Sequence, residues 1–343
     1  MKLNLFSKKT FPYPLIIFLL FFVLVLSVIG SIVLGRYPIA FRELIGILSS
    51  SFTHIEPFWT PVQESLLLHH RLPRILLACM VGGALSVSGA AYQGIFQNPM
   101  ASPDILGASS GAAFGAALAI YLGQGKYMII LFAFLSSLLT VAVVAYIGNR
   151  AKGKRSMGMI LSGIMVSSFI TSATSYLKLV ADPEDQLPAI TYWLMGSFNG
   201  TVPEDLLLAL FPMLLGLLPL LLLRWKINLL TLGDEEAETM GIQTKKLRLL
   251  VIFCSTLLTA ASVSVSGMIG WVGLVIPHLT RRMVGNNYRY LLPASLLFGA
   301  IFLLMVDNIS RNLLATEIPI GILTSFIGAP FFLTLISKGG DRH

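Results

Sequence analysis

The residues best suited to bind a partner by charge lie together, between two long apolar halves of the chain. Acids and bases crowd into the segment from Leu221 to Arg248, LLLRWKINLLTLGDEEAETMGIQTKKLR, although only 12% of the 343 residues are charged. A segment with this charge density is expected in water. We predict that it is a cytoplasmic loop through which another protein holds this one.

The acidic part of this segment is bounded by glycines and is predicted to form a short helix. Glu, Ala and Met favour helix, and acids near a helix N-terminus interact favourably with its dipole. The alternative is a solvated loop without a partner, which is what charged loops usually are. The residues predicted to couple this chain to a partner are Gly233, Asp234, Glu235, Glu236, Ala237 and Gly241.

Enzymatic and metal chemistry find little support in the sequence. There is no G-x-x-x-x-G-K-[S/T] loop to cradle a phosphate. His278 has no second ligand at metal-site spacing, and both Cys79 and Cys254 fall inside apolar runs where they are expected to pack. A membrane-embedded enzyme would need a convergent cluster of nucleophile or metal ligands, which the sequence does not offer. We expect no catalytic residue, metal or cofactor in this chain.

Composition sets the class of protein. Hydrophobic residues make up 55% of the chain and the mean hydropathy is +0.81, more than a soluble domain can bury. The net charge of +8 does not indicate nucleic-acid binding, because the basic residues form short clusters between apolar runs, as in membrane proteins. The chain is predicted to be an all-α polytopic membrane protein.

Ten apolar runs are predicted to cross the bilayer. A crossing helix needs about 17–25 residues. The first run follows three lysines but is longer than the apolar core of a secretory signal, so we interpret it as an uncleaved span. The predicted spans lie near 11–34, 72–95, 104–123, 127–148, 157–178, 204–223, 247–267, 268–283, 291–312 and 318–337, the eighth being shorter and interrupted by Gly and Pro.

The basic residues predict the orientation. With a cytoplasmic N-terminus, 17 of the 24 Lys and Arg residues lie inside and 7 outside. Such a bias favours both termini, and the charged loop at 224–248, on the cytoplasmic side. We expect the lipid bilayer around the spans, and the family resemblance given below implies that this bilayer is the cytoplasmic (inner) membrane of a prokaryote.

The chain is also predicted to contain an inverted repeat within a single domain, 1–343. S-V-S-G occurs at 86–89 and at 264–267, and a proline follows each copy at the same spacing, Pro99 and Pro277. The predicted repeats, about 65–180 and 243–338, run across the membrane in opposite directions, as in alternating-access transporters. The alternative is that small residues recur in any tightly packed helix bundle.

Polar residues within the spans predict the path and the outer surface. The fifth span is rich in hydroxyls, which suits a wet wall, although hydroxyls also bond between helices. Asp307 and Arg311 share a helix face and are expected to pair. Arg71, Arg74 and Arg311 are expected at the outer boundary, where they either anchor helix ends or bind carboxylates of another protein. The residues predicted to line the path are Ser162, Ser168, Thr171, Ser172 and Ser325.

The energy for transport is expected from a separate subunit. The sequence has neither a phosphate-binding loop nor the chain of carboxylates in mid-span that ion-driven carriers usually need. A secondary transporter would share the inverted repeat and is the alternative. Uptake that persists after ATP depletion with an intact ion gradient would favour it.

Five segments together resemble one known family. They are RLPR at 71–74, GAAYQGIFQNPMASPDILGASSGA at 89–112, LGDEEAETMG at 232–241, SGMIGWVGLVIPHLTR at 266–281, and IPIGILTSFIGAPFF at 318–332, where Ile318 replaces the usual leucine. The chain is similar, nearly end to end, to FecCD-type permeases. These are the membrane subunits of ABC importers for iron–siderophore complexes, haem and cobalamin.

The resemblance implies a set of partners and roles. It implies a ten-span subunit that works as a dimer, here a homodimer, with two ATPase subunits that hold ATP and Mg²⁺ and an extracytoplasmic substrate-binding protein. It further implies that residues 233–241 seat in the ATPase and that the fifth and tenth spans line the path. Arginines matching Arg71, Arg74 and Arg311 would meet carboxylates of the binding protein.

The cargo is the least determined part of the prediction. Iron–siderophore complexes are the commonest substrates of the family that the chain resembles, and we expect such a complex or a related metal chelate. Haem, cobalamin and an oxyanion such as molybdate stay open as alternatives. No part of the sequence indicates nucleic-acid binding.

Overall fold

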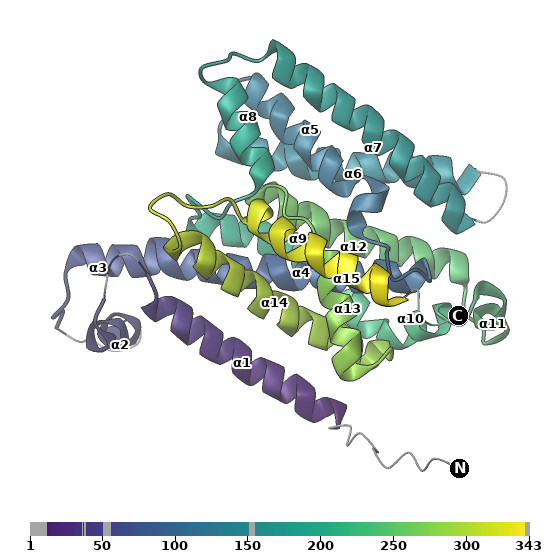
Figure 1. The fold of residues 1–343 in the computed structure, drawn as a ribbon, viewed down its shortest axis with the longest axis horizontal. Coiled ribbons are helices and arrows are strands. Elements are labelled where there is room, and N and C mark those ends of the chain that lie inside the picture. Colours follow the sequence, from purple (N-terminus) through teal and green to yellow (C-terminus); the bar gives the residue numbers. More distant parts are fainter. Residues whose placement is uncertain (1–11, 36, 38, 51–55, 151–154, 340–343) are drawn as a thin grey trace.

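The fold is a bundle of long helices whose axes run mainly along the long dimension of the molecule (Figure 1). The computed structural model describes residues 12–35, 37, 39–50, 56–150 and 155–339. Within these ranges the regular structure is helical, without a strand. The predicted all-α membrane fold is therefore confirmed.

Ten helices correspond to the ten predicted spans. Among the described residues, seven helical stretches are long and apolar enough to cross a membrane, and the helices α5, α13 and α15 complete the set. In chain order the ten are α1 (Tyr13–Val33), α4 (Leu72–Ile95), α5 (Ala108–Tyr121), α6 (Lys126–Arg150), α7 (Arg155–Val180), α9 (Pro203–Leu222), α12 (Thr244–Ser266), α13 (Val272–Val284), α14 (Tyr288–Asn312) and α15 (Ile320–Gly339).

Short helices lie between the spans and at the two ends of the bundle. Figure 1 places α2 and α3 at one end of the long axis and α11 at the opposite end. These short elements are α2 (Phe41–Ser50), α3 (Pro61–Ser65), the π-helical turn η1 (Leu66–Arg71), the 3₁₀ turn η2 (Pro103–Leu106), α8 (Gln186–Met195), α10 (Arg224–Leu230) and α11 (Asp234–Thr239).

Helix α4 is the centre of the bundle and is buried along nearly its whole length. It packs against α12, α13 and α14. Two close approaches depend on glycine, because a Cβ at Gly82 would collide with the Gly299 carbonyl of α14, and a Cβ at Gly89 with the Gly273 carbonyl of α13. Small residues at helix contacts are how bundles in lipid achieve tight packing, where apolar burial adds little driving force.

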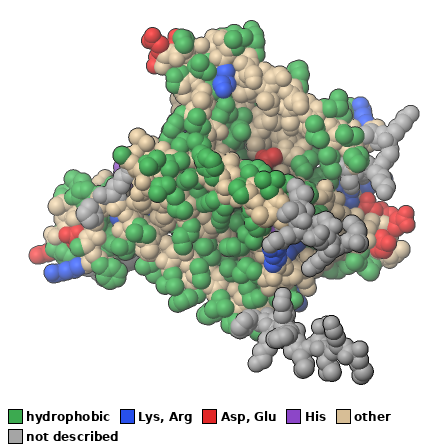
Figure 2. All heavy atoms as spheres, in the orientation of Figure 1, with side chains coloured by type: hydrophobic (Ala, Val, Ile, Leu, Met, Phe, Trp, Pro, Cys, Tyr) green, Lys and Arg blue, Asp and Glu red, His purple; other side chains and the backbone are tan. Residues whose placement is uncertain are grey.

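The outer helices present apolar side chains to the surroundings. Phe18, Phe22 and Ile29 of α1 are exposed, although each is strongly apolar. Figure 2 shows hydrophobic side chains over much of the visible face, with charged side chains mostly near its margins. This distribution is expected of a surface that contacts lipid.

Three chain segments meet where α12 ends: the loop after α8, the end of α12 and the start of α15. Helix α12 ends at Gly267, whose φ of 68° is in the left-handed region. The Ser197 amide donates to the Ser266 carbonyl (2.8 Å), and the Ile320 amide donates to the Gly196 carbonyl (2.9 Å). The loop after α8, the end of α12 and the start of α15 are thereby joined through main-chain hydrogen bonds.

The two S-V-S-G segments differ in local structure. The copy at 86–89 lies inside α4, which continues to Ile95, whereas the copy at 264–267 ends α12. The two helices do pack together, because Ser88 Oγ donates to the Ser255 carbonyl (2.9 Å) and lies 3.0 Å from Thr259 Oγ1. The inverted repeat and its boundaries, 65–180 and 243–338, stay a prediction.

Candidate functional site

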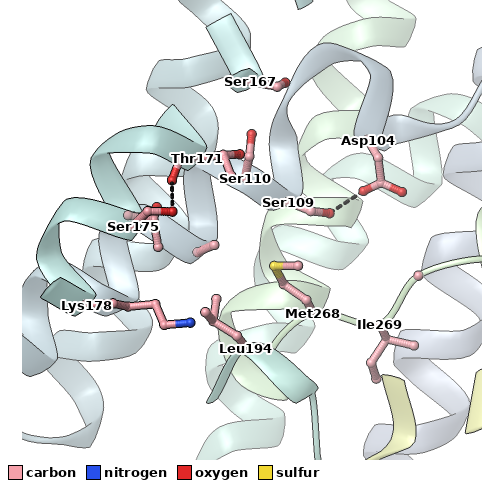
Figure 3. A pocket seen from close by; sticks show the side chains of 13 residues that line it. Asp104, Ser109, Ser110, Ser167, Thr171, Ser175, Lys178, Leu194, Met268 and Ile269 are labelled. Carbon is pink, nitrogen blue, oxygen red and sulfur yellow. Dashed lines mark hydrogen bonds between the residues drawn. The ribbon is translucent and has the colours of Figure 1, made fainter. Parts of the chain in front are cut away.

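A cavity of about 450 Å³ lies beside the hydroxyl-rich face of α7. Figure 3 shows the α7 side chains on one side of it, and the η2–α5 segment and the break after α12 on the other. Its lining residues are Asp104, Ser109, Ser110, Ala113, Ser167, Thr171, Thr174, Ser175, Lys178, Leu194, Met268, Ile269 and Gly270.

The α7 residues of the cavity form one helical stripe. Positions 167, 171, 174, 175 and 178 recur at intervals of three and four, so they share a face. The helix lies close to η2, since a Cβ at Gly163 would collide with the Ile105 carbonyl. The helical period puts these hydroxyls on one face, and the packing of α7 against η2 turns that face to the cavity.

The hydroxyls of this stripe interact weakly with their surroundings. Thr174 Oγ1 donates to the Ile170 carbonyl (3.0 Å) and Ser175 Oγ donates to the Thr171 carbonyl (3.0 Å), so their protons are used within α7. Ser167 Oγ is buried and has no hydrogen-bond partner among the described residues. Such a wall offers many weak polar contacts, which lets a hydrated solute enter and also leave.

Two charged residues lie at the cavity and were not predicted as path residues. The Asp104 carboxylate accepts a hydrogen bond from Ser109 Oγ at the start of α5. Lys178 comes from the far end of the α7 stripe (Figure 3). Asp104 directly follows Pro103, and an acid beside a proline at the start of an apolar run is the sequence signal that could have identified it.

The predicted path residues are placed in different environments. Thr171 lines the cavity, whereas Ser162 lines a second one of about 420 Å³ between α6 and α7. Ser168 and Ser172 are exposed on α7 and donate to carbonyls of their own helix. Ser325 is exposed on α15 and donates to the Gly321 carbonyl (2.7 Å). Within this chain, the structure does not bring the five together around one space.

At the end of the bundle where α11 lies, the acidic helix is seated by its inner face. Ala237 is fully buried. Asp234 pairs with the buried Arg248 of α12 (2.6 Å), and Glu238 accepts a hydrogen bond from Thr244 Oγ1 (2.7 Å). Of the predicted coupling residues, Asp234 and Ala237 thus hold the helix on α12.

The outer face of α11 offers a mixed acidic and apolar surface. Glu235 and Glu236 are exposed, and so are Leu232 and Met240. The bounding glycines Gly233 and Gly241 have φ values of 136° and 80°, a conformation that favours glycine. Sequence reasoning did not single out Leu232 and Met240, because an exposed apolar residue cannot be recognised from composition alone.

Arg71 lies at the end of the bundle opposite α11, and its guanidinium group bonds to the main chain. It donates to the Ile32 carbonyl (2.8 Å) and to the Tyr37 carbonyl (2.9 Å). The residue is only 6% exposed. In this structure Arg71 therefore joins η1 to the end of α1 and to the connection that follows it.

Arg74 and Arg311 share one buried carboxylate. Asp307 has no exposed surface and forms ion pairs with Arg74 (2.9 Å) and Arg311 (3.1 Å). Arg74 also pairs with Glu317 (2.9 Å), just before α15, and Arg311 donates to Ser31 Oγ of α1 (2.9 Å). The predicted pairing of Asp307 with Arg311 is confirmed, and the network connects α1, α4, α14 and the segment before α15.

Among the described residues no group of three or more His, Cys, Asp or Glu side chains is arranged to hold a metal ion. Cys254 is buried and Cys79 half-buried, and both are free thiols. His278 lies in α13 with its ring 6.3 Å from that of Phe331. The described chain thus combines a cavity with a polar lining and a short acidic helix at one end of the bundle.

Comparison with known proteins identifies the family. A model described as the FecCD transport family matches residues 22–338. The molybdate import system permease protein MolB of Haemophilus influenzae is 43% identical over 326 residues, covering 95% of this chain and 96% of that protein. A probable iron chelatin transport system permease protein of Helicobacter pylori is 43% identical over 273 residues, covering 80% of this chain and 82% of its own length.

The fold of a solved relative supports the same family. A metal-chelate type ABC transporter in an inward-facing conformation superimposes with a TM-score of 0.85 at 42% identity, covering 95% of this chain and all of that one. Permeases of this family work with ATPase and substrate-binding partners. The seven long apolar stretches are consistent with a multi-pass protein of the inner membrane. The chain therefore belongs to the FecCD transport family, the membrane permeases of ABC importers.

Proposed function

We propose that this chain is the permease of an ATP-driven importer that carries an iron–siderophore complex or a related metal chelate across the cytoplasmic membrane. The observation that carries the proposal is the hydroxyl-lined cavity beside α7, in a chain with a separate docking helix at one end of the bundle. A cavity lined mainly by hydroxyls, with one carboxylate and no cluster of metal ligands among the described residues, suits a solute that keeps its own metal coordination shell.

Two copies of the chain are proposed to enclose the path between them. Ser168, Thr171, Ser172 and Ser175 are all exposed and follow one face of α7. Lipid chains cannot form hydrogen bonds with these hydroxyl groups, whereas water in a space shared with a second copy could. Ser325 of α15, also exposed, is proposed to face the same space.

The partner ATPase is proposed to grip α11 and to hold ATP and Mg²⁺, with one ATPase subunit for each permease copy. The inner face of α11 is seated on α12, so a push on the outer face is transmitted to a spanning helix. The proposal requires α11 and both termini to lie in the cytoplasm, and the distribution of basic residues supports this orientation.

The substrate-binding protein is proposed to dock at the opposite end of the bundle. The arginines predicted for this role, Arg71, Arg74 and Arg311, are at most 8% exposed and have partners inside the chain. Docking on them requires that carboxylates of the partner reach or replace these contacts. Reversal of Arg71 to Glu should then slow association in a salt-dependent manner. If the Arg71→Glu permease binds the partner as fast as the parent permease does, at both low and high salt, then the arginine acts only within this chain.

Molybdate is a second candidate substrate, favoured by the similarity to MolB over nearly the whole chain. Lys178 at the cavity would attract an oxyanion, whereas Asp104 would repel it. Haem and cobalamin are further candidates among the solutes that permeases of this family carry.

The test is uptake by proteoliposomes that contain the permease and its ATPase, with the substrate-binding protein supplied outside. Radiolabelled ferric siderophore, haem, cobalamin and molybdate are offered in turn, with ATP enclosed in the lumen. ATP-dependent accumulation of the ferric siderophore supports the proposal, and accumulation of molybdate alone would replace that substrate with the oxyanion. Uptake driven by an ion gradient without ATP would overturn the ABC mechanism.

A further inference from the structure

Helix α2 has an apolar stripe that no part of the described chain covers. Phe41, Ile45 and Leu48 are spaced i, i+4 and i+7 and are 63%, 50% and 36% exposed. The buried side of the same helix consists of Leu44, Gly46 and Ile47. The apolar arc of α2 is therefore wider than the part that packs on the protein, and the uncovered part is continuous along one face.

The other side of α2 packs against α3 and η1, which run without a break into α4. Leu44 and Ile47 pack with Trp59 and Leu67 in a small separate core. The Glu43 carboxylate accepts hydrogen bonds from Gln63 Nε2 (2.7 Å) and from the Ala40 amide (3.0 Å). With its core side and its acid both engaged, α2 cannot easily rotate to hide the exposed stripe.

The connection from α1 to α2 is held by Arg71. Its two hydrogen bonds go to the carbonyls of Ile32, in the last turn of α1, and of Tyr37, just before α2. In Figure 1, α2 is seen nearly end-on while α1 lies in the plane of the view, so the two axes cross steeply. If α1 crosses the bilayer, α2 runs along its surface.

We propose that α2 is an interfacial helix, with Phe41, Ile45 and Leu48 inserted at the boundary between lipid headgroups and acyl chains. Helix α2 comes next in the chain after α1, to which Arg71 ties it, and the exposed apolar side chains of α1 are suited to a lipid-facing surface. Arg42, exposed beside the stripe and 4.9 Å from the Phe58 ring, is suited to lipid phosphate. The phospholipid bilayer therefore occupies this surface. The insertion of α2 would fix the height of helices α2 and α3 relative to the membrane.

The test uses a fluorophore attached to single cysteines in the full-length permease, reconstituted in phospholipid nanodiscs without the ATPase, so that α11 stays open to water. Labels at positions 41, 45 and 48 are compared in a background with Cys79 and Cys254 replaced. Phe22→Cys on α1 serves as the lipid-facing control and Glu235→Cys on α11 as the water-facing control. Quenching is measured with a phospholipid that carries a nitroxide high on its acyl chain, and separately with aqueous iodide.

Insertion predicts that the lipid nitroxide quenches the three α2 labels at least about twofold more than the label at 235, with little quenching by iodide. A second variant, Arg71→Ala, should reduce the lipid quenching on α2 while leaving that at position 22 unchanged. Strong iodide quenching on α2 would overturn the proposal. So would protection from both quenchers, because a protein partner or a second copy would then cover the stripe.

Discussion

At the scale of single residues, the least expected feature is that one buried carboxylate serves two arginines. Asp307 balances Arg74 and Arg311, and Glu317 adds a second acid to Arg74. Buried charges are tolerated when they are paired, and removal of one partner leaves the rest uncompensated. The network therefore contributes to holding together α1, α4, α14 and the segment before α15.

Replacement of Arg74 by Ala is expected to destabilise the permease by about 3–5 kcal/mol, because Asp307 and Glu317 lose a shared partner in a buried site. Thermal unfolding in detergent measures the change. Arg42→Ala is the matched control, since Arg42 is exposed and has no ion pair among the described residues. Similar stability of the two variants would show that the buried network contributes little.

At the scale of elements, the central helix α4 depends on close backbone contacts. Gly89 has no room for a side chain against Gly273 of α13, whereas a Cβ at Gly30 of α1 would have no neighbouring atom within 4 Å. The same substitution should therefore have opposite effects at the two sites.

Gly89→Ala is expected to destabilise the bundle by about 1–3 kcal/mol through overpacking. Gly30→Ala is expected to be neutral or to stabilise α1 by up to about 1 kcal/mol, because alanine is the better helix former. Thermal unfolding and the yield of folded protein in detergent measure both. An equal effect at the two positions would contradict the packing of α4 on α13.

The α7 stripe makes a prediction about access. Single cysteines at 171 and 175, in a background without Cys79 and Cys254, should react with a membrane-impermeant thiol reagent, because these positions are exposed and line the cavity. A cysteine at 162 should react more slowly, since Ser162 faces α6. Rates that change when nucleotide is added would link the cavity to the transport cycle, and uniform protection along α7 would place the path elsewhere.

The two faces of α11 predict two kinds of variant. Glu235→Lys with Met240→Glu alters only exposed side chains and should weaken ATPase binding while the permease stays folded. Ala237→Asp places a charge in a buried position and should unseat the helix from α12. Co-purification with the ATPase measures the first and limited proteolysis the second. Unchanged co-purification of the surface variant would remove α11 from the interface.

At the scale of the whole molecule, the short helices divide the bundle into two functional ends. Helices α2 and α3 lie at one end and α11 at the other, with the spans between them (Figure 1). This arrangement suits a permease that receives substrate on one side of the membrane and is driven from the other.

The orientation of the bundle across the membrane can be tested by labelling in sealed vesicles. Cysteines at Val62 of α3 and at Glu235 of α11, both exposed, should react with an impermeant reagent from opposite sides of the membrane. In right-side-out vesicles Val62→Cys should be labelled and Glu235→Cys only after permeabilisation, because the basic residues favour a cytoplasmic α11. Labelling of both from one side would contradict the topology.

The spans, the acidic helix and the family could all be predicted from the sequence, because each depends on local pattern. Apolar runs of sufficient length must be helices in lipid, where every main-chain group needs a partner. The segment between Gly233 and Gly241 contains its own helix formers and its own stop signals. The pairing of Asp307 with Arg311 was predictable for the same reason, since four residues separate them on one helix.

Only the tertiary structure decided which face of each helix meets which neighbour. The hydroxyls of α7 run around the helix, so composition could not separate Thr171, at the cavity, from Ser162, against α6. Arg71 and Arg74 were predicted at a boundary, but their partners come from 34 and 243 residues away along the chain. Contacts between residues so far apart in the chain depend on how the helices pack. The local sequence around each residue does not predict them.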